Sequence, residues 1–420
     1  MLEEENARKA WLKDTRQLLW DGQVSAVICA CIDASLLSPA VPANIHLRRP
    51  PQRPCTVHAN CKEKEMLPKE RFLRALRLQP TDRVPLFDFL FQKPLYQALI
   101  GHAPESYNAA DAMACTYALG LDAVWIPFGA FAGWQPPRLA ANVYKDEWGT
   151  TFQSNESAWP IDAPIAYPLH TRQDLACYTP PDPRLPGRLD EIHTALAINA
   201  AVGDKAVAIL GGVGGPFTQS WMLTGYENIA LNVYDDPGFL KDLAALNNQF
   251  AIPAVEALAE AGVDGIIISE DLGDSTREFL QLKHFREIYL PYIAEIAAHI
   301  QQYKLPAILH SCGHITNYLD DLVALGLSAV HPLQRTAGMD LATVKRRYGD
   351  RICIIGNIDS SRTLPYGSKE EIAAEVREAL RIGMPGGGYV LASDHSLHDG
   401  ISVANILTMF GVARQEGVYR

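Results

Sequence analysis

From Met66 to the carboxyl terminus, short apolar runs alternate with longer helical patterns, and this alternation constrains the fold more than any other feature. Parallel neighbouring strands need a crossover connection, so repeated strand-helix units are typical of a parallel sheet. Eight units favour a closed sheet, and we therefore predict an α/β fold of the (β/α)₈ (TIM) barrel type. The expected strands are residues 83–89, 122–128, 206–213, 265–271, 306–312, 329–334, 352–359 and 389–395.

Two glycines mark the ends of expected helices. Gly262 and Gly326 follow helical patterns and precede the next apolar run, as helix-terminating glycines do. Residues 129–205 interrupt the alternation: 143–152 has a hairpin pattern, and a proline-rich stretch follows it. We interpret this region as a hairpin insertion in the barrel.

An open, doubly wound sheet is the alternative architecture. It would carry a glycine-rich dinucleotide turn after its first strand, and no such turn follows Phe89. Residues 211–216 are glycine-rich but lack an acidic residue at the expected distance, so they are interpreted as a strand-to-helix loop.

The first 65 residues differ in composition from the rest. They contain an apolar run and then a proline- and arginine-rich stretch, which predicts an irregular amino-terminal extension preceding a barrel domain at 66–420. Cys55, His58 and Cys61 lack a second Cys/His pair at zinc-knuckle spacing. Met66 is an alternative start, because it begins a helix that leads directly into the first strand.

Charge and hydropathy narrow the class of partner. A formal net charge of −11 argues against nucleic acid or an anionic membrane, since both attract basic surfaces. No apolar stretch approaches the roughly 20 residues of a membrane span, and the amino terminus is acidic where a signal peptide would be basic. We expect a cytoplasmic protein that acts on a small molecule.

Polar or glycine residues stand at seven of the eight expected strand ends. In TIM barrels the reactive residues come from the carboxyl ends of the strands. Polar groups at the ends of apolar strands are costly to bury unless they bind something. The residues are Asp88, Gly211, Gly212, Glu270, Asp271, His310, Cys312, His331, Gln334, Asn357, Asp359, Asp394 and His395.

Within this set, catalytic roles are predicted for carboxylates and one histidine, and substrate contacts for a second group. The catalytic candidates are Asp88, Glu270, Asp271 and His395. The substrate-binding candidates are Gly212, His331, Gln334, Asn357 and Asp359.

His310 and Cys312 form the candidate metal site. They are two residues apart on a strand, so their side chains project to the same side. A thiolate and an imidazole suit Zn²⁺, and a third ligand would leave a fourth position for substrate. His395, Glu270 and Asp271 are the candidates for that third ligand. The alternative is a core histidine beside a buried thiol, and the pair alone does not decide between the two.

Three segments resemble the uroporphyrinogen decarboxylase superfamily, and the resemblance covers about Met66 to Arg420. They are Leu309-His-Ser-Cys-Gly-His314, Tyr348-Gly-Asp-Arg-Ile-Cys-Ile-Ile-Gly-Asn-Ile-Asp359 and Pro385-Gly-Gly-Gly-Tyr-Val-Leu-Ala-Ser-Asp-His395. The resemblance implies a (β/α)₈ barrel and one of two chemistries. These are cofactor-free decarboxylation of uroporphyrinogen and zinc-dependent methyl transfer involving corrinoid proteins.

The methyltransferase branch is marked by a His-x-Cys pair and a late ligand, usually cysteine. The pair matches His310 and Cys312, whereas the late position is His395, which suits zinc but also satisfies the decarboxylase pattern. A decarboxylase needs arginines in the strand-one loop to bind eight carboxylates. Here that loop has Lys93 and no arginine. The expected mouth is instead apolar and aromatic, with Phe91, Tyr96, Trp125 and Phe128.

The sequence therefore predicts a zinc-dependent methyltransferase that uses a corrinoid supplied by a partner protein. Its metal ligands would be His310, Cys312 and His395, with Glu270 or Asp271, and its substrate a small methylated molecule, such as a methoxylated aromatic, or a thiol. The alternatives are uroporphyrinogen decarboxylase, which needs no cofactor, and a non-catalytic tetrapyrrole-binding barrel. A homodimer is left open.

Overall fold

The computed structural model describes residues 65–129, 138–154 and 159–419. The predicted extension at 1–65, apart from Glu65, lies outside the described residues. From Met66 onwards the chain forms one compact unit. Buried Ile, Leu, Val and Ala side chains from the strands and from the facing sides of the helices form its core.

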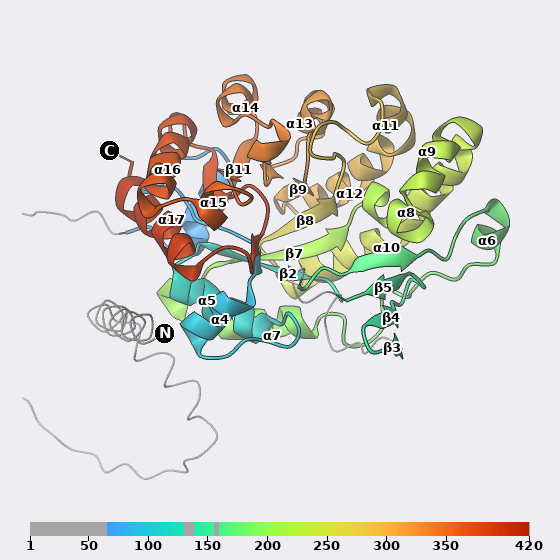
Figure 1. Cartoon of the computed structure of the whole chain (residues 1–420), viewed down its shortest axis with the longest axis horizontal. Helices are drawn as coiled ribbons and strands as arrows, with labels where there is room; N and C mark the ends of the chain where they lie inside the picture. The colour runs from blue at the N-terminus through green and yellow to red at the C-terminus, as the bar shows by residue number, and fades with distance from the viewer. Residues whose placement is uncertain (1–64, 130–137, 155–158, 420) are drawn as a thin grey trace, which may run out of the picture. The chain divides into compact units, whose positions relative to one another are not determined.

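Seven parallel strands form the central sheet, in the order β12-β11-β10-β9-β8-β7-β2. Each lies within or at most one residue beyond an apolar run predicted from the sequence. Figure 1 shows the helices arranged around the outside of these strands. The strands are β2 (Ala123–Pro127), β7 (Ala208–Gly214), β8 (Gly265–Glu270), β9 (Ala307–Ser311), β10 (Ala329–His331), β11 (Cys353–Ile358) and β12 (Tyr389–Ser393).

The prediction of a regular strand at 83–89 is wrong in detail. This segment occupies the gap between β12 and β2, but it forms a single parallel bridge, Leu86 to Leu391, instead of a continuous ladder. The Leu86 carbonyl accepts from Asp122 N–H at 2.8 Å, whereas Leu86 N–H donates to the Asp122 carboxylate. Side-chain acceptors thus replace part of the backbone ladder. Regular pairing resumes at β1 (Leu90–Phe91), which is parallel to β13 (Leu397–His398).

Helices connect the strands, and several begin and end as expected. Asn108 and Ser368 cap two amino termini through side-chain oxygens. Gly262 (φ 95°) and Gly326 (φ 71°) end helices, as predicted. The helices are α3 (Pro68–Leu76), α4 (Lys93–Ile100), α5 (Ala109–Leu119), α6 (Arg172–Ala176), α7 (Asp190–Ala201), α8 (Pro216–Thr224), α9 (Tyr226–Asp235), α10 (Pro237–Ala261), α11 (Leu282–Ile288), α12 (Leu290–Gln302), α13 (Leu319–Ala324), α14 (Leu341–Tyr348), α15 (Thr363–Tyr366), α16 (Lys369–Gly383) and α17 (Val403–Glu416), with short 3₁₀ turns η2 (Gly203–Lys205), η3 (Thr316–Tyr318) and η4 (Arg335–Ala337).

The predicted insertion is a four-stranded antiparallel sheet. The expected hairpin corresponds to two of its strands, and the tight turn between them forms because Gly149 adopts φ 83° while the Asp146 carboxylate accepts from Thr150 N–H. Figure 1 shows this sheet beside the barrel. Its strands are β3 (Arg138–Ala140), β4 (Val143–Lys145), β5 (Thr151–Gln153) and β6 (Ala163–Ala166).

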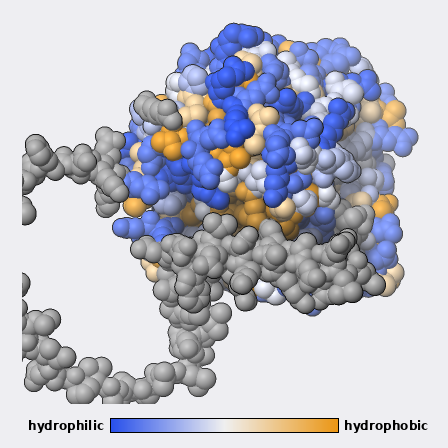
Figure 2. All heavy atoms as spheres, turned by 60° about the vertical axis from the view of Figure 1, so that its left-hand side comes forward, coloured by the Kyte–Doolittle hydropathy of each residue, from blue (hydrophilic) through white to orange (hydrophobic). Residues whose placement is uncertain are grey.

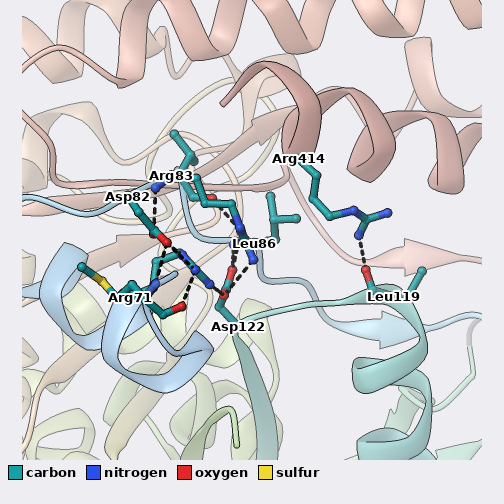
Figure 3. A network of polar contacts seen from close by, with 9 residues as sticks. Arg71, Asp82, Arg83, Leu86, Leu119, Asp122 and Arg414 are labelled. Atoms are coloured by element: carbon teal, nitrogen blue, oxygen red, sulfur yellow. Dashed lines mark hydrogen bonds and ion pairs between the residues drawn. The ribbon is translucent and has the colours of Figure 1, made fainter. Parts of the chain in front are cut away.

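A buried ion network joins α3, the irregular first strand and the start of β2 (Figure 3). Arg71, on α3, is 1% exposed and contacts Asp122 at 2.7 Å and Asp82 at 2.6 Å. Arg83 contacts the other oxygen of Asp122 at 2.9 Å. Asp122 also holds Leu86 N–H, so one carboxylate connects two guanidinium groups to the closing strand.

Figure 2 shows a face on which hydrophilic side chains predominate and hydrophobic residues form scattered patches. None of the helices in the described part of the chain is long and apolar enough to cross a membrane.

Asp122→Asn should lower the free energy of unfolding by about 3–5 kcal/mol, because it removes the buried counter-charge that Arg71 and Arg83 share, at nearly constant side-chain shape. Urea unfolding followed by circular dichroism measures this. Glu416→Gln breaks the exposed ion pair with Arg377 and serves as the control, with little expected change. Equal effects of the two substitutions would contradict the importance of the buried network.

Candidate functional site

The carboxyl ends of β8, β9 and β10 meet in register at the predicted site. Glu270 pairs with Ser311 and Ser269 with His310. On the other side of β9, His310 pairs with His331. Strand pairing alone therefore places Asp271, which follows β8, beside Cys312, which follows β9.

Asp271, His310 and Cys312 bring one ligand atom each within 4.8 Å of one another. The Cys312 Sγ lies 3.4 Å from His310 Nε2, and Asp271 Oδ1 lies 3.9 Å from the same nitrogen. A carboxylate, an imidazole and a thiol are the ligand types of catalytic zinc sites. The sequence left Glu270 and Asp271 as alternative carboxylate ligands, and Asp271 is the one that lies in this group.

The surrounding protein disfavours charge at each member of this group. Burial raises the pKa of the Cys312 thiol well above its usual value and lowers that of His310 to about 3. It also raises the pKa of Asp271 to about 6, although 37% of that side chain is exposed. A bound cation would favour the thiolate and the carboxylate in this environment.

His395 lies close to the group but outside it. Its side chain is exposed, and its Nδ1 is 3.0 Å from Ser396 Oγ. It contributes to lowering the pKa of both His310 and His331, after burial. His395 therefore belongs to the same end of the barrel, and its role as a metal ligand stays a prediction.

Glu270 faces away from this group, toward the amino terminus of α8. Its buried carboxylate accepts from Phe217 N–H at 3.1 Å and Thr218 N–H at 2.8 Å. Burial raises its pKa to about 7. These contacts cap α8, because the first N–H groups of a helix lack partners within the helix.

Asp88 joins the closing strand to β12. Its carboxylate accepts from the N–H and the hydroxyl of Ser393, each at 2.8 Å, and from Phe89 N–H at 3.0 Å. Burial raises its pKa to about 7. These contacts support barrel closure, and the predicted catalytic role of Asp88 stays a prediction.

Gly212, a predicted substrate contact, makes room for an indole ring. A Cβ at this position would lie 2.3 Å from Trp125 Nε1. That nitrogen is buried and has no hydrogen-bond partner among the described residues. Trp125 packs against Phe89, with ring centroids 4.8 Å apart, and against Phe91 at 5.9 Å.

The expected aromatic residues of the mouth are all largely buried: Phe91, Tyr96, Trp125 and Phe128 are 1–8% exposed. Lys93, the cation of the strand-one loop, lies 5.4 Å from the ring centre of Trp159.

Three of the other predicted substrate-binding residues form hydrogen bonds to the backbone of loops. Gln334 accepts from Gly313 N–H at 2.7 Å. Asn357 donates to the carbonyls of Leu333 and Met339.

Asp359 accepts from the N–H groups of Ser361 and Arg362 at 2.8 Å each. Hydrogen bonds of this kind support the backbone around a site, and direct substrate contact by Gln334, Asn357 and Asp359 stays a prediction.

His331 lies beside His310. It is 1% exposed, and the two Nδ1 atoms are 2.8 Å apart.

Sequence reasoning did not assign roles to two features near the site. Asp394 stands at a strand end, and its buried carboxylate accepts from the N–H and the hydroxyl of Ser360. Trp221, Tyr226 and Phe279 form a stack with centroid separations of 4.5 and 4.7 Å.

Burial raises the pKa of Tyr226 and the nearby Asp271 raises it further, so the stack adjoins the candidate metal site. Its members come from two helices and a loop, and the sequence carries no local signal for it.

Comparisons with known proteins agree with this architecture. Residues 147–416 match the family model described as uroporphyrinogen decarboxylase (URO-D). The uroporphyrinogen decarboxylase of Anaeromyxobacter dehalogenans is 28% identical over 350 residues, covering 80% of this chain and 95% of that protein.

The methylcobamide:CoM methyltransferase MtbA of Methanosarcina mazei is 26% identical over 329 residues, covering 76% and 91%. A solved methyltransferase from Methanosarcina mazei has a TM-score of 0.62 at 21% identity, covering 84% of this chain and 99% of that one. This structural likeness shows the (β/α)₈ barrel fold.

Gly212→Ala should displace the Trp125 ring and lower the free energy of unfolding by about 1–3 kcal/mol, as overpacking does. Near-ultraviolet circular dichroism and urea unfolding measure the two effects. Gly411→Ala, in α17, is the control, since nothing lies within 4 Å of its added Cβ and alanine favours helix. An unchanged aromatic signal in Gly212→Ala would contradict the packing argument.

Proposed function

Because the chain belongs to the uroporphyrinogen decarboxylase family, we propose that it is the methyl-transferring kind of member. In this proposal it moves a methyl group between a small methylated substrate, or a thiol, and a corrinoid held by a partner protein. One observation carries the proposal: Asp271, His310 and Cys312 converge at the carboxyl end of the barrel. A cofactor-free decarboxylase has no need of this set of ligand atoms.

The spacing of the ligand atoms is close to that of a zinc site. Zinc bonds of about 2.0–2.3 Å in a tetrahedral arrangement place neighbouring ligand atoms roughly 3.3–3.6 Å apart. His310 Nε2 lies 3.4 Å from Cys312 Sγ, within this range, and 3.9 Å from Asp271 Oδ1, slightly beyond it. A three-residue set leaves one position for a substrate atom, as catalytic sites require. Zinc bound there would act as a Lewis acid on the ether oxygen or thiol of the substrate.

The protein's own groups would position the substrate. His395 is exposed beside His310 and can contact a substrate or complete the metal site. The stacked rings of Tyr226 and Phe279, each more than a third exposed, offer an apolar aromatic surface near Asp271. Such surfaces suit a small apolar or aromatic methyl donor.

Charge also favours this function over decarboxylation. Uroporphyrinogen carries eight carboxylates, which call for several cations. In the strand-one loop, Lys93 is engaged with the Trp159 ring. The partner predicted from the sequence, a corrinoid protein, matches the methylcobamide substrate in the name of the MtbA relative.

Decarboxylation remains the second candidate. Two observations favour it: His395 stands outside the ligand group, and the pKa of Asp88 is raised to about 7 by burial, which provides a carboxyl group able to carry a proton near neutral pH. The relative from Anaeromyxobacter dehalogenans bears that activity in its name.

Purified protein should contain about one zinc ion per chain, as measured by plasma mass spectrometry. Cys312→Ala and Asp271→Asn should each weaken zinc binding at least about tenfold, because each removes a proposed ligand. Glu270→Gln should keep the zinc, since this carboxylate caps α8. Folded wild-type protein that binds no zinc would overturn the proposal, and loss of zinc in Glu270→Gln alone would reassign the ligand.

Activity assays distinguish methyl transfer from decarboxylation. With cob(I)alamin as the probe, wild-type protein should form methylcobalamin from a methoxylated aromatic or a methyl thioether, and Cys312→Ala should slow this by about 10²-fold or more. The same protein incubated with uroporphyrinogen and a chelator should form no coproporphyrinogen. Chelator-resistant coproporphyrinogen formation that is lost in Asp88→Asn would establish decarboxylation instead.

A further inference from the structure

We propose that His331 is a positioning residue for the metal site: it accepts a hydrogen bond from His310 Nδ1 and so directs the free nitrogen of His310 toward Cys312 and Asp271. The inference rests on the proposed function and deepens it. It differs from a substrate-binding role for His331, because that side chain is 1% exposed.

The backbone fixes the two rings side by side. His310 and His331 are directly paired in the parallel ladder of β9 and β10. Their ring centroids are 5.0 Å apart, and the two Nδ1 atoms lie 2.8 Å apart, at hydrogen-bond distance. The remaining nitrogen of His310, Nε2, is the atom that faces Cys312 Sγ and Asp271 Oδ1.

The contact between the two nitrogens can hold one proton. A neutral imidazole has one N–H donor and one bare nitrogen acceptor. If His310 is to bind a metal through Nε2, its proton must reside on Nδ1, and His331 must then accept through its own Nδ1. The metal-binding tautomer of His310 thus requires His331 to carry its proton on Nε2.

Among the described residues, His310 is the polar partner of the His331 ring. That ring is packed against Phe87, with centroids 5.5 Å apart, and Phe89 at 4.8 Å. Its Nε2 is buried and has no hydrogen-bond partner among the described residues. No other described side chain therefore competes with His310 for the orientation of this ring.

A matched pair of substitutions tests the role. Asn places an oxygen near the position of the histidine Nδ1 and can accept the same hydrogen bond, whereas Leu fills similar space without an acceptor. Relative to wild type, His331→Leu should weaken metal binding by about 10–100-fold, and His331→Asn should restore most of the loss. Affinity is measured with Co²⁺ and Zn²⁺ by absorption and by chelator competition.

Thermal unfolding of the metal-free proteins checks whether either substitution acts only on the fold. A merely structural role predicts that metal affinity follows thermal stability. A positioning role predicts that the two variants differ in affinity beyond any difference in their stability. Wild-type affinity in stably folded His331→Leu would overturn the inference and leave the proposed function intact, whereas absence of metal binding in wild-type protein would overturn both.

A measurement on wild-type protein needs no variant to fold. Histidine labelled with ¹⁵N reports its tautomer through nitrogen chemical shifts. In the Zn²⁺-loaded protein, the inference requires one histidine with its proton on Nδ1 hydrogen-bonded to a second with its proton on Nε2. A proton on Nδ1 of the second ring would contradict it.

Discussion

The in-register pairing of β8, β9 and β10 is the constraint on which the site depends. Parallel backbone hydrogen bonds align the ends of these strands, so that Asp271, Cys312 and His331 surround His310 without any long-range side-chain contact being needed. A one-residue shift would turn every side chain of the shifted strand to the opposite face of the sheet. The ligand group is thus a direct consequence of β-sheet geometry.

Barrel closure imposes a second constraint. The segment before β1 cannot form a regular ladder with both neighbours, and carboxylates complete the pairing at its two ends: Asp122 holds Leu86 N–H near the start, and Asp88 holds Ser393 N–H near the site. Burial raises the pKa of both carboxyl groups. Their partners differ: Asp122 contacts two arginines, whereas Asp88 accepts hydrogen bonds from Ser393 and Phe89.

The same fold supports two reactions in this family. The reactions depend on different side chains at the mouth of the barrel, where substrate would bind. Three ligand atoms and exposed aromatic rings support methyl transfer, while the raised pKa of Asp88 and the accessible His395 are what a proton-handling decarboxylase would use. The two relatives compared are 28% and 26% identical to this chain, a difference too small to decide between the reactions. The chemistry of the side chains at the strand ends is therefore a stronger argument for one reaction than sequence identity is.

The sequence by itself determined the architecture and which side chains stand at the ends of the strands. Apolar periodicity gave seven strands close to their observed bounds because regular strands depend on local pattern. The His-x-Cys spacing placed both side chains on one face for the same reason. The irregular strand at 83–89 looked regular, since nothing local shows that Asp122, far along the chain, takes the Leu86 N–H.

Tertiary structure decided which contacts the individual residues make. Glu270 and Asp271 are adjacent and chemically alike, yet one caps α8 and the other faces Cys312, because consecutive residues project to opposite sides. Gly212, Gln334 and Asn357 support neighbouring groups, and His331 meets His310 through strand pairing. Such roles depend on contacts between residues distant in sequence, which composition and spacing do not encode.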